Sequence, residues 1–176
     1  QLYHRVEDGV VRAALEIEID EGWHLYHTDL GPGIGKPTEL ELTGSGVTWG
    51  ELRFPEPERI DQPGLGPGGA DTHVLGHHGT IVVWAVGRAA SASDDIGVAI
   101  QGLTCQDDGS CVLYSQDVTS DGAGSDKLFG DFPADLVASL DESNGGGASD
   151  SAKAEYRGES ATLSDGHVEA TLYARG

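Results

Sequence analysis

The chain has 176 residues, enough for one domain with its own hydrophobic core, or one domain and a tail, without help from a disulfide. Asp and Glu number 30 against 10 Lys and Arg, and the resulting formal charge of -20 repels phosphate backbones and anionic lipid headgroups. We therefore expect no nucleic-acid partner and no role at a membrane surface. Such acidity is also typical of a well-hydrated surface without a specific partner.

Membrane and targeting signals are absent from the sequence. No stretch approaches the roughly 20 consecutive apolar residues of a membrane span, and Gln1 opens a polar stretch without the regions of a signal peptide. This pattern is consistent with a cytosolic protein or with one whose signal was removed. Two cysteines, many glycines and no methionine fit a processed extracytoplasmic fragment, for which we expect no direct membrane insertion.

Alternating apolar and polar residues predict β-strands in the first half of the chain. The clearest is "VRAALEIEID", residues 11–20, with one apolar and one largely polar face. A short aromatic strand follows within residues 21–30, and alternation returns at residues 38–43 and 47–54. The proline- and glycine-rich residues 55–70 predict a long surface loop.

The second half of the chain adds three strands to this pattern. They are expected at residues 80–88, 96–105 and 111–118, and the first of them is apolar enough for burial on both faces. Turn signals recur between all these strands, and helical periodicity is almost absent. We therefore predict an all-β, immunoglobulin-like β-sandwich with one short helix and a C-terminal extension.

The helix is expected over residues 131–142, where three apolar residues recur at every fourth position: Phe132, Leu136 and Leu140. The glycine-rich residues 141–153 predict a flexible linker, and residues 154–176 offer one more hairpin. We therefore expect an immunoglobulin-like domain over residues 1–130. Residues 131–176 would then be part of the same domain or an extension of it.

The two cysteines, Cys105 and Cys111, flank the turn sequence "QDDGS". Cysteines on paired strands can face each other with Cα atoms about 4.5 to 5.5 Å apart, a separation that suits a disulfide. A ring this short contributes only roughly 2 kcal/mol to stability. Because a stabilising bridge would more usefully join distant segments, a purely structural disulfide is only one of three interpretations.

A metal site is the second interpretation, since seven histidines accompany the cysteines. His24 and His27 point to opposite faces of a regular strand, as do His77 and His78. One histidine of each pair would have to converge with both cysteines. No C-x2-C spacing supports zinc, and we predict neither a metal nor another cofactor.

A redox-active dithiol is the third interpretation. Exchange needs a sulfur that a partner's cysteine can reach, and a hairpin tip provides that access. The spacing is not C-x-x-C, and Asp107 and Asp108 disfavour a thiolate. We therefore expect slow reaction with small reagents and a rate that depends on the partner.

Two motifs of the chain resemble those of one family. The first is "IDEGWHLYHTDL", residues 19–30, and the second is "IQGLTCQDDGSCVLY", residues 100–114. They resemble, in the same order, the D-G-hydrophobic-x-L-Y strand and the Y-Q-G-C stretch of the N-terminal extracytoplasmic domain of the DsbD family of transmembrane protein-disulfide reductases. The first motif has one inserted residue and the second is two residues longer before Cys105, but the cysteine spacing is identical.

The resemblance implies an immunoglobulin-like sandwich whose cysteine pair carries electrons. Cys111 would form mixed disulfides with partners, and Cys105 would resolve them. Reducing equivalents would arrive from a membrane-embedded electron donor domain and leave to periplasmic thioredoxin-fold proteins, such as disulfide isomerases and cytochrome c maturation factors. The chain would then be periplasmic or otherwise extracytoplasmic, as the soluble part of a membrane protein.

The resemblance also implies neighbours for the redox pair. The expected strand neighbours are Trp23, His24 and Tyr26. Family members shield the pair with a cap loop that bears an aromatic residue; its counterpart here is the loop before Thr72, where Leu65 is the only bulky apolar candidate. The stretch "VLY" at residues 112–114 stands where the family has Y-P-P, and residues after Asp121 have no counterpart.

The alternative is a non-catalytic acidic sandwich for binding or adhesion, in which the disulfide is only structural. A metal-binding sandwich is the third possibility. Replacement of both cysteines by serine would separate a redox role, in which partner reduction is lost, from a structural one, in which folding is lost.

Overall fold

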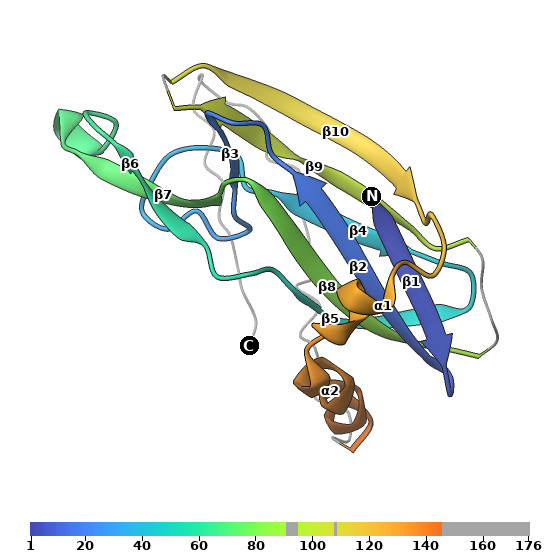
Figure 1. Ribbon diagram of the computed structural model, residues 1–176. Coiled ribbons are helices and arrows are strands. Elements are labelled where there is room, and N and C mark those ends of the chain that lie inside the picture. Colours follow the sequence, from blue (N-terminus) through green and yellow to red (C-terminus); the bar gives the residue numbers. More distant parts are fainter. Residues whose placement is uncertain (91–94, 108, 146–176) are drawn as a thin grey trace, which may run out of the picture.

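The computed structural model describes residues 1–90, 95–107 and 109–145, which form two packed antiparallel sheets (Figure 1). The four-stranded sheet has the order β1 (Leu2–Glu7), β2 (Val10–Glu18), β8 (Thr80–Ala89) and β5 (Val47–Arg53). The six-stranded sheet has the order β10 (Cys111–Thr119), β9 (Gly97–Gln106), β3 (Trp23–Tyr26), β7 (Thr72–His77) and β6 (Glu58–Gln62), with β4 (Glu39–Thr43) paired to β9. The expected all-β, immunoglobulin-like sandwich is confirmed.

The main core lies between the two sheets and follows from the alternation of apolar residues along the strands. Its buried members include Leu15, Ile81, Val83, Val98 and Ile100. Burial of one such side chain contributes about 1.5 to 3 kcal/mol relative to its exposure. The apolar face predicted from residues 11–20 is therefore the face that packs against the opposite sheet.

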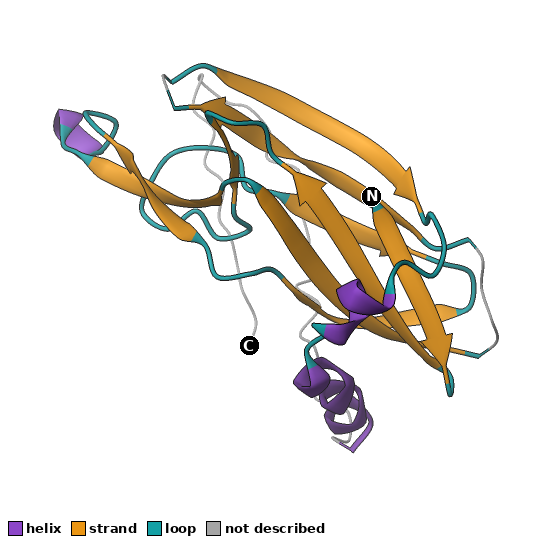
Figure 2. Cartoon of the chain, in the orientation of Figure 1, coloured by secondary structure: helices purple, strands orange, loops and turns teal. Residues whose placement is uncertain are grey.

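Two helices follow β10, where the sequence predicted only one. They are α1 (Asp126–Gly130) and α2 (Ala134–Gly145), coloured purple beside the orange strands in Figure 2. Pro133 lacks the N–H that would continue α1 and stands directly before α2, where a proline is tolerated. Leu136 and Leu140 are buried against Val86 of β8, so α2 covers part of the outer face of the four-stranded sheet.

The prediction of an uninterrupted loop over residues 55–70 is wrong, because β6 lies within it. Prolines precede and follow this strand but do not occur inside "ERIDQ", so all its N–H groups remain available to the ladder with β7. Only residues 63–71 connect the two strands, and they include one 3-10 turn, Pro67–Gly69. Figure 1 shows the β6–β7 hairpin projecting from one end of the sandwich.

Only part of the predicted C-terminal linker and hairpin lies within the described residues. α2 continues to Gly145, so the first residues of the expected linker are helical. The remainder of the linker and the expected hairpin lie outside the described residues. In the part of the chain that the structure describes, no helix is both long enough and apolar enough to cross a bilayer.

Candidate functional site

Cys105 and Cys111 lie directly opposite each other on β9 and β10 and form a disulfide, with Cα atoms 4.0 Å apart. The Gln106 N–H donates to the Ser110 carbonyl at 2.7 Å and closes the turn between the strands. Gly109 adopts a φ of 99°, which glycine reaches without the steric cost that other residues incur. The turn residues of the sequence thus bring the two sulfurs together, as their spacing predicted.

The two sulfurs differ sharply in accessibility. Cys105 is 2% exposed and belongs to a small buried cluster with Tyr26 and Val74. Cys111 is exposed, at the start of β10. Because an attacking thiolate must approach the sulfur that it attacks, Cys111 is the sulfur that a visiting protein can reach.

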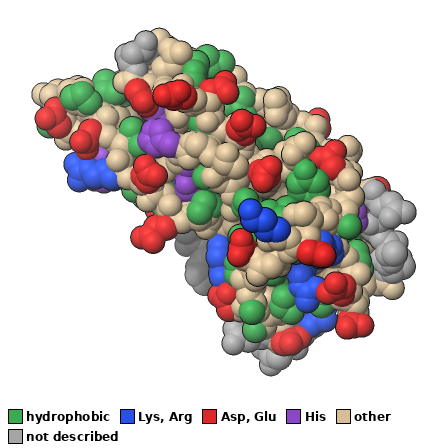
Figure 3. Space-filling model, in the orientation of Figure 1, with side chains coloured by type: hydrophobic (Ala, Val, Ile, Leu, Met, Phe, Trp, Pro, Cys, Tyr) green, Lys and Arg blue, Asp and Glu red, His purple; other side chains and the backbone are tan. Residues whose placement is uncertain are grey.

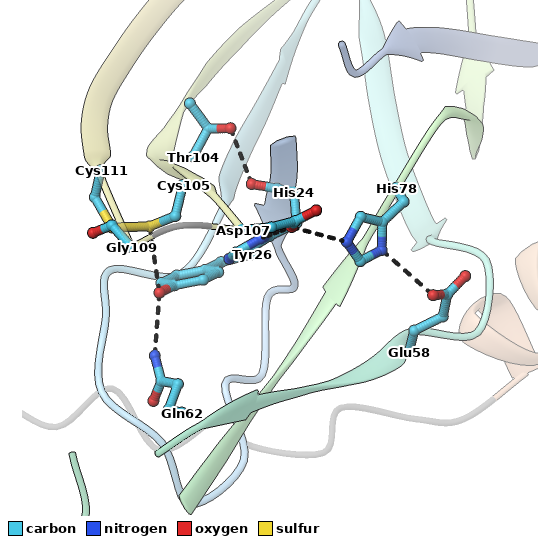
Figure 4. A network of polar contacts seen from close by, with 10 residues as sticks. All are labelled: His24, Tyr26, Glu58, Gln62, His78, Thr104, Cys105, Asp107, Gly109 and Cys111. Atoms are coloured by element: carbon cyan, nitrogen blue, oxygen red, sulfur yellow. Dashed lines mark hydrogen bonds and ion pairs between the residues drawn. A yellow bond between two sulfur atoms is a disulfide. The ribbon is translucent and has the colours of Figure 1, made fainter. Parts of the chain in front are cut away.

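The Tyr26 hydroxyl lies next to the buried sulfur of Cys105 (Figure 4). Its hydroxyl lies 3.3 Å from Cys105 Sγ, and Gln62 Nε2 donates to the same hydroxyl oxygen at 3.1 Å. A disulfide sulfur carries no proton, so the Tyr26 hydroxyl is the donor to Cys105. Burial raises the pKa of Tyr26, which keeps this hydroxyl protonated at neutral pH.

Gln62 also fixes the loop between β3 and β4 over the Tyr26 ring. Its Nε2 donates to the Ile34 carbonyl at 2.8 Å, and its Oε1 accepts from the Ile34 N–H at 2.9 Å. The loop lies so close to the ring that a Cβ at Gly35 would be 2.0 Å from Tyr26 Cε2. Sequence reasoning missed Gln62 and Gly35, because Gln62 stood in the expected loop and nothing local linked Gly35 to the cysteines.

Of the neighbours expected for the cysteine pair, His24 lies beside Cys105, whereas Trp23 and Leu65 lie elsewhere. His24 is the strand partner of Cys105, and its ring stacks on Tyr26 with centroids 5.5 Å apart. Trp23, one position earlier, packs against the main core between the sheets. Leu65 is 53% exposed in the β6–β7 connection and is not part of the cluster around Cys105. Apolar residues that pack against this cluster are Leu30, Ile60 and Leu103.

Two exposed apolar side chains follow the accessible sulfur, one on each face of β10. Val112 and Leu113 follow Cys111 directly and are 52% and 68% exposed. Within the described residues β10 pairs with β9 alone, so it forms an edge of the six-stranded sheet. An edge strand presents unpaired N–H and C=O groups to another chain, and here it does so beside a reachable disulfide.

The comparison with known families gives a match over most of these elements. Residues 3–122 match the family described as "Thiol:disulfide interchange protein DsbD, N-terminal". This range includes both sheets and both cysteines, but neither helix. No curated protein matches the chain.

Two solved structures are similar to this chain. One is the N-terminal periplasmic domain of ScsB from Proteus mirabilis, with 19% identity, a TM-score of 0.47, and coverage of 80% of this chain and 49% of that one. The other is the N-terminal domain of DsbD from Neisseria meningitidis in the reduced form, with 16% identity, a TM-score of 0.41, and coverage of 69% and 83%. The chain thus spans about half the length of the ScsB structure. On the family match over residues 3–122, the chain belongs to the family of DsbD N-terminal domains.

Proposed function

We propose that this chain is an extracytoplasmic thiol–disulfide exchange module, which relays reducing equivalents to periplasmic proteins through a reversible Cys105–Cys111 disulfide. The observation that carries the proposal is the asymmetry of the pair. Cys111 is exposed at a sheet edge, whereas Cys105 is 2% exposed and faces the Tyr26 hydroxyl. One sulfur is thus suited to meet a partner and the other to resolve the mixed disulfide.

Transfer to a client starts from the dithiol form of the module. The Cys111 thiolate attacks one sulfur of a client disulfide, a Cys111–client bond forms, and the second client sulfur leaves as a thiolate and takes up a proton. The Cys105 thiolate then attacks Cys111 Sγ, which restores the internal disulfide and releases the client as a dithiol. Two electrons pass to the client in each cycle.

Regeneration uses the same steps in reverse. A donor thiolate attacks Cys111 Sγ, and Cys105 leaves as a thiolate. The donor's second thiolate then releases the module and becomes oxidised with the first. As negative charge develops on Cys105, the hydrogen bond from Tyr26 stabilises it.

Family membership supports the choice of partners and compartment. The donor would be a membrane-embedded domain and the acceptors thioredoxin-fold proteins of the periplasm, including those that serve cytochrome c biogenesis. Val112 and Leu113 would dock such partners beside Cys111. We assign the exchange domain to residues 1–130 and regard residues 131–176 as an extension.

The test uses two variants that each keep one thiol, Cys105→Ser and Cys111→Ser. Each is mixed with a thioredoxin-fold partner that lacks its own resolving cysteine and carries its remaining cysteine as a mixed disulfide with an aromatic thiol. Attack by the variant's thiolate on the partner's sulfur forms the protein–protein disulfide and releases the coloured aromatic thiolate. Cys105→Ser should form the mixed disulfide at least about tenfold faster than Cys111→Ser, because its thiol is the exposed one.

Thermal unfolding of both variants is the control for folding. Equal trapping by the two variants would contradict the assigned roles. A wild-type protein that transfers no electrons to the partner, together with cysteine variants that fail to fold, would favour a structural disulfide in a non-catalytic sandwich.

A further inference from the structure

Three side chains with metal-binding atoms converge beside the disulfide (Figure 4). His24 comes from β3, His78 from the turn between β7 and β8, and Asp107 from the β9–β10 turn. Asp107 Oδ1 lies 3.3 Å from His24 Nδ1 and 3.7 Å from His78 Nε2. The three ligand atoms all lie within 4.8 Å of one another.

The two histidine pairs of the sequence divide between two environments. His27 Nδ1 and His77 Nε2 lie 2.9 Å apart and share a hydrogen bond, whereas His24 and His78 both face Asp107. The expectation of no metal site assumed that cysteines would have to complete the ligand set. The carboxylate of Asp107 instead supplies the third ligand atom, and both sulfurs are joined to each other.

The separations between the ligand atoms are compatible with binding of one ion. Nitrogen and oxygen ligands about 2.0 to 2.2 Å from a tetrahedral zinc ion lie roughly 3.3 Å from each other. The two contacts to Asp107 Oδ1, 3.3 and 3.7 Å, are close to this spacing. The 3.3 Å contact is also a long hydrogen bond between the His24 ring and Asp107.

The surroundings prepare these side chains for a cation. The Glu58 carboxylate lies 3.3 Å from His78 Nδ1, and a carboxylate on the far nitrogen is the usual way to orient a metal-binding histidine. His24 is 6% exposed, so surrounding side chains hold its ring in place, and an imidazole nitrogen is a common metal ligand. Asp107 is exposed, which leaves one side open for entry of the ion.

Long-range electrostatics also favour a cation here. Figure 3 shows acidic side chains spread over the face drawn, with histidine side chains among them toward the end that carries the β6–β7 hairpin. A chain with a formal charge of -20 raises the local concentration of cations. Imidazole nitrogens select transition metals over Mg²⁺ and Ca²⁺, which prefer all-oxygen sites.

We propose that His24, His78 and Asp107 bind one divalent transition-metal ion of the zinc type, with Glu58 orienting His78. Three protein ligands with a water molecule as the fourth would give the arrangement of an open zinc site, and the exposed Asp107 places the ion where water can reach it. It uses no cysteine thiolate and therefore exists in the oxidised protein. The proposal is independent of the exchange reaction and stands or falls separately from it.

The test is a calorimetric titration of Zn²⁺ into chelator-treated, oxidised protein in excess Mg²⁺ at neutral pH. We expect one Zn²⁺ per chain. His78→Gln and Asp107→Asn should each weaken Zn²⁺ binding by at least about tenfold, and Glu58→Gln by roughly tenfold. The matched controls are His73→Gln and Asp117→Asn, which change a histidine and an aspartate outside the cluster and should bind Zn²⁺ as the wild type does.

Co²⁺ provides a second readout, because its visible absorption reports the coordination geometry. The wild type should give the intense bands of a four-coordinate site, and Asp107→Asn should lose them. Thermal unfolding would show that the variants are folded, as expected for changes to a half-exposed and an exposed side chain. Equal affinities in His78→Gln, Asp107→Asn and the two controls would overturn the proposal, as would complete displacement of Zn²⁺ by Mg²⁺, which marks diffuse binding to surface carboxylates.

Discussion

The chemistry of Cys105 depends on two side chains from distant parts of the sequence. Gln62 donates to the Tyr26 oxygen, which leaves the Tyr26 proton free to point at Cys105 Sγ. Tyr26 could be expected near the cysteines from its motif. Gln62 could not, because a single glutamine in a proline- and glycine-rich stretch carries no pattern that identifies its partner.

Removal of the Tyr26 hydroxyl should slow cleavage of the disulfide. Tyr26→Phe keeps the ring but leaves the Cys105 thiolate without its donor, a loss of about 1.5 kcal/mol or roughly tenfold in rate. Stopped-flow reduction by dithiothreitol measures the effect. Tyr114→Phe is the matched control, since the Tyr114 hydroxyl bonds the Thr38 hydroxyl and neither sulfur; equal rates in the two variants would exclude the role given to Tyr26.

Among the structural elements, the β9–β10 hairpin contributes most to the site. Its turn aligns the two cysteines, and its outer strand carries the exposed Val112 and Leu113. Leu113 lies on the same face of β10 as Cys111 and Val112 on the other face, and two large exposed apolar side chains on an edge strand are a feature of interaction sites. Val112 and Leu113 are therefore predicted to form a docking surface for a protein partner on β10.

Polar replacement of Val112 and Leu113 should slow thiol–disulfide exchange with protein partners and leave exchange with small thiols unchanged. The double variant Val112→Ser/Leu113→Ser should lower the rate of exchange with a thioredoxin-fold partner about tenfold, or about 1.4 kcal/mol, which is more than most single interface residues contribute. Its reduction by dithiothreitol should stay unchanged. Both rates are measured by the loss of the disulfide, under the same conditions, for the variant and the wild type.

Leu65→Ser is the matched control, because Leu65 is exposed to a similar degree, 53%, but lies in the β6–β7 connection. It should leave the partner rate unchanged. An equal loss of partner rate in the two variants would argue against docking on β10.

The elements differ in how well the sequence predicted them. Strand β2 and the cysteine hairpin were predictable, because strict alternation and an Asp-Gly turn are local signals. Strand β6 was not, since its five residues are stabilised by the ladder with β7 and are flanked by prolines. The predicted helix at residues 131–142 corresponds to α2, whereas α1 was missed because its five residues are too few to show a helical period.

At the scale of the whole molecule, the buried histidines make stability depend on pH. Burial lowers the pKa of His77 to about 4, and the neighbouring His27 acts in the same direction. An unfolded histidine titrates near pH 6.5, so between about 6.5 and 4 the unfolded chain binds more protons than the native one. The free energy of unfolding therefore falls as the pH falls through this window.

His77→Gln should reduce this dependence on pH. Between pH 7.5 and 4, the free energy of unfolding of the wild type should fall by roughly 3 kcal/mol more than that of the variant. Only the wild type has a His77 that binds a proton in the unfolded chain and stays neutral in the native one. Urea unfolding at a series of pH values measures how the free energy of unfolding changes with pH in each protein. Subtracting the variant's curve from that of the wild type removes the contribution of the many carboxylates, which the two proteins share. Parallel slopes would show that His77 does not titrate as its burial implies.

The site as a whole could be predicted only in part, because its residues come from strands that are distant in the sequence. β3, β6 and the β9–β10 turn are far apart along the chain and meet only because the six-stranded sheet places β3 between β9 and β7. The resemblance supplied the pairing of β3 with the cysteines. The contributions of Gln62 and His78 depend on strand order, which no local pattern specifies.

The reduction potential of the Cys105–Cys111 pair tests the central claim most directly. Oxidised protein is equilibrated with dithiothreitol or glutathione buffers, and the fraction of free thiol is determined by alkylation and mass. A pair that exchanges with partners should have a potential above about -300 mV. A potential well below that value, the range of inert structural bridges, would contradict the account.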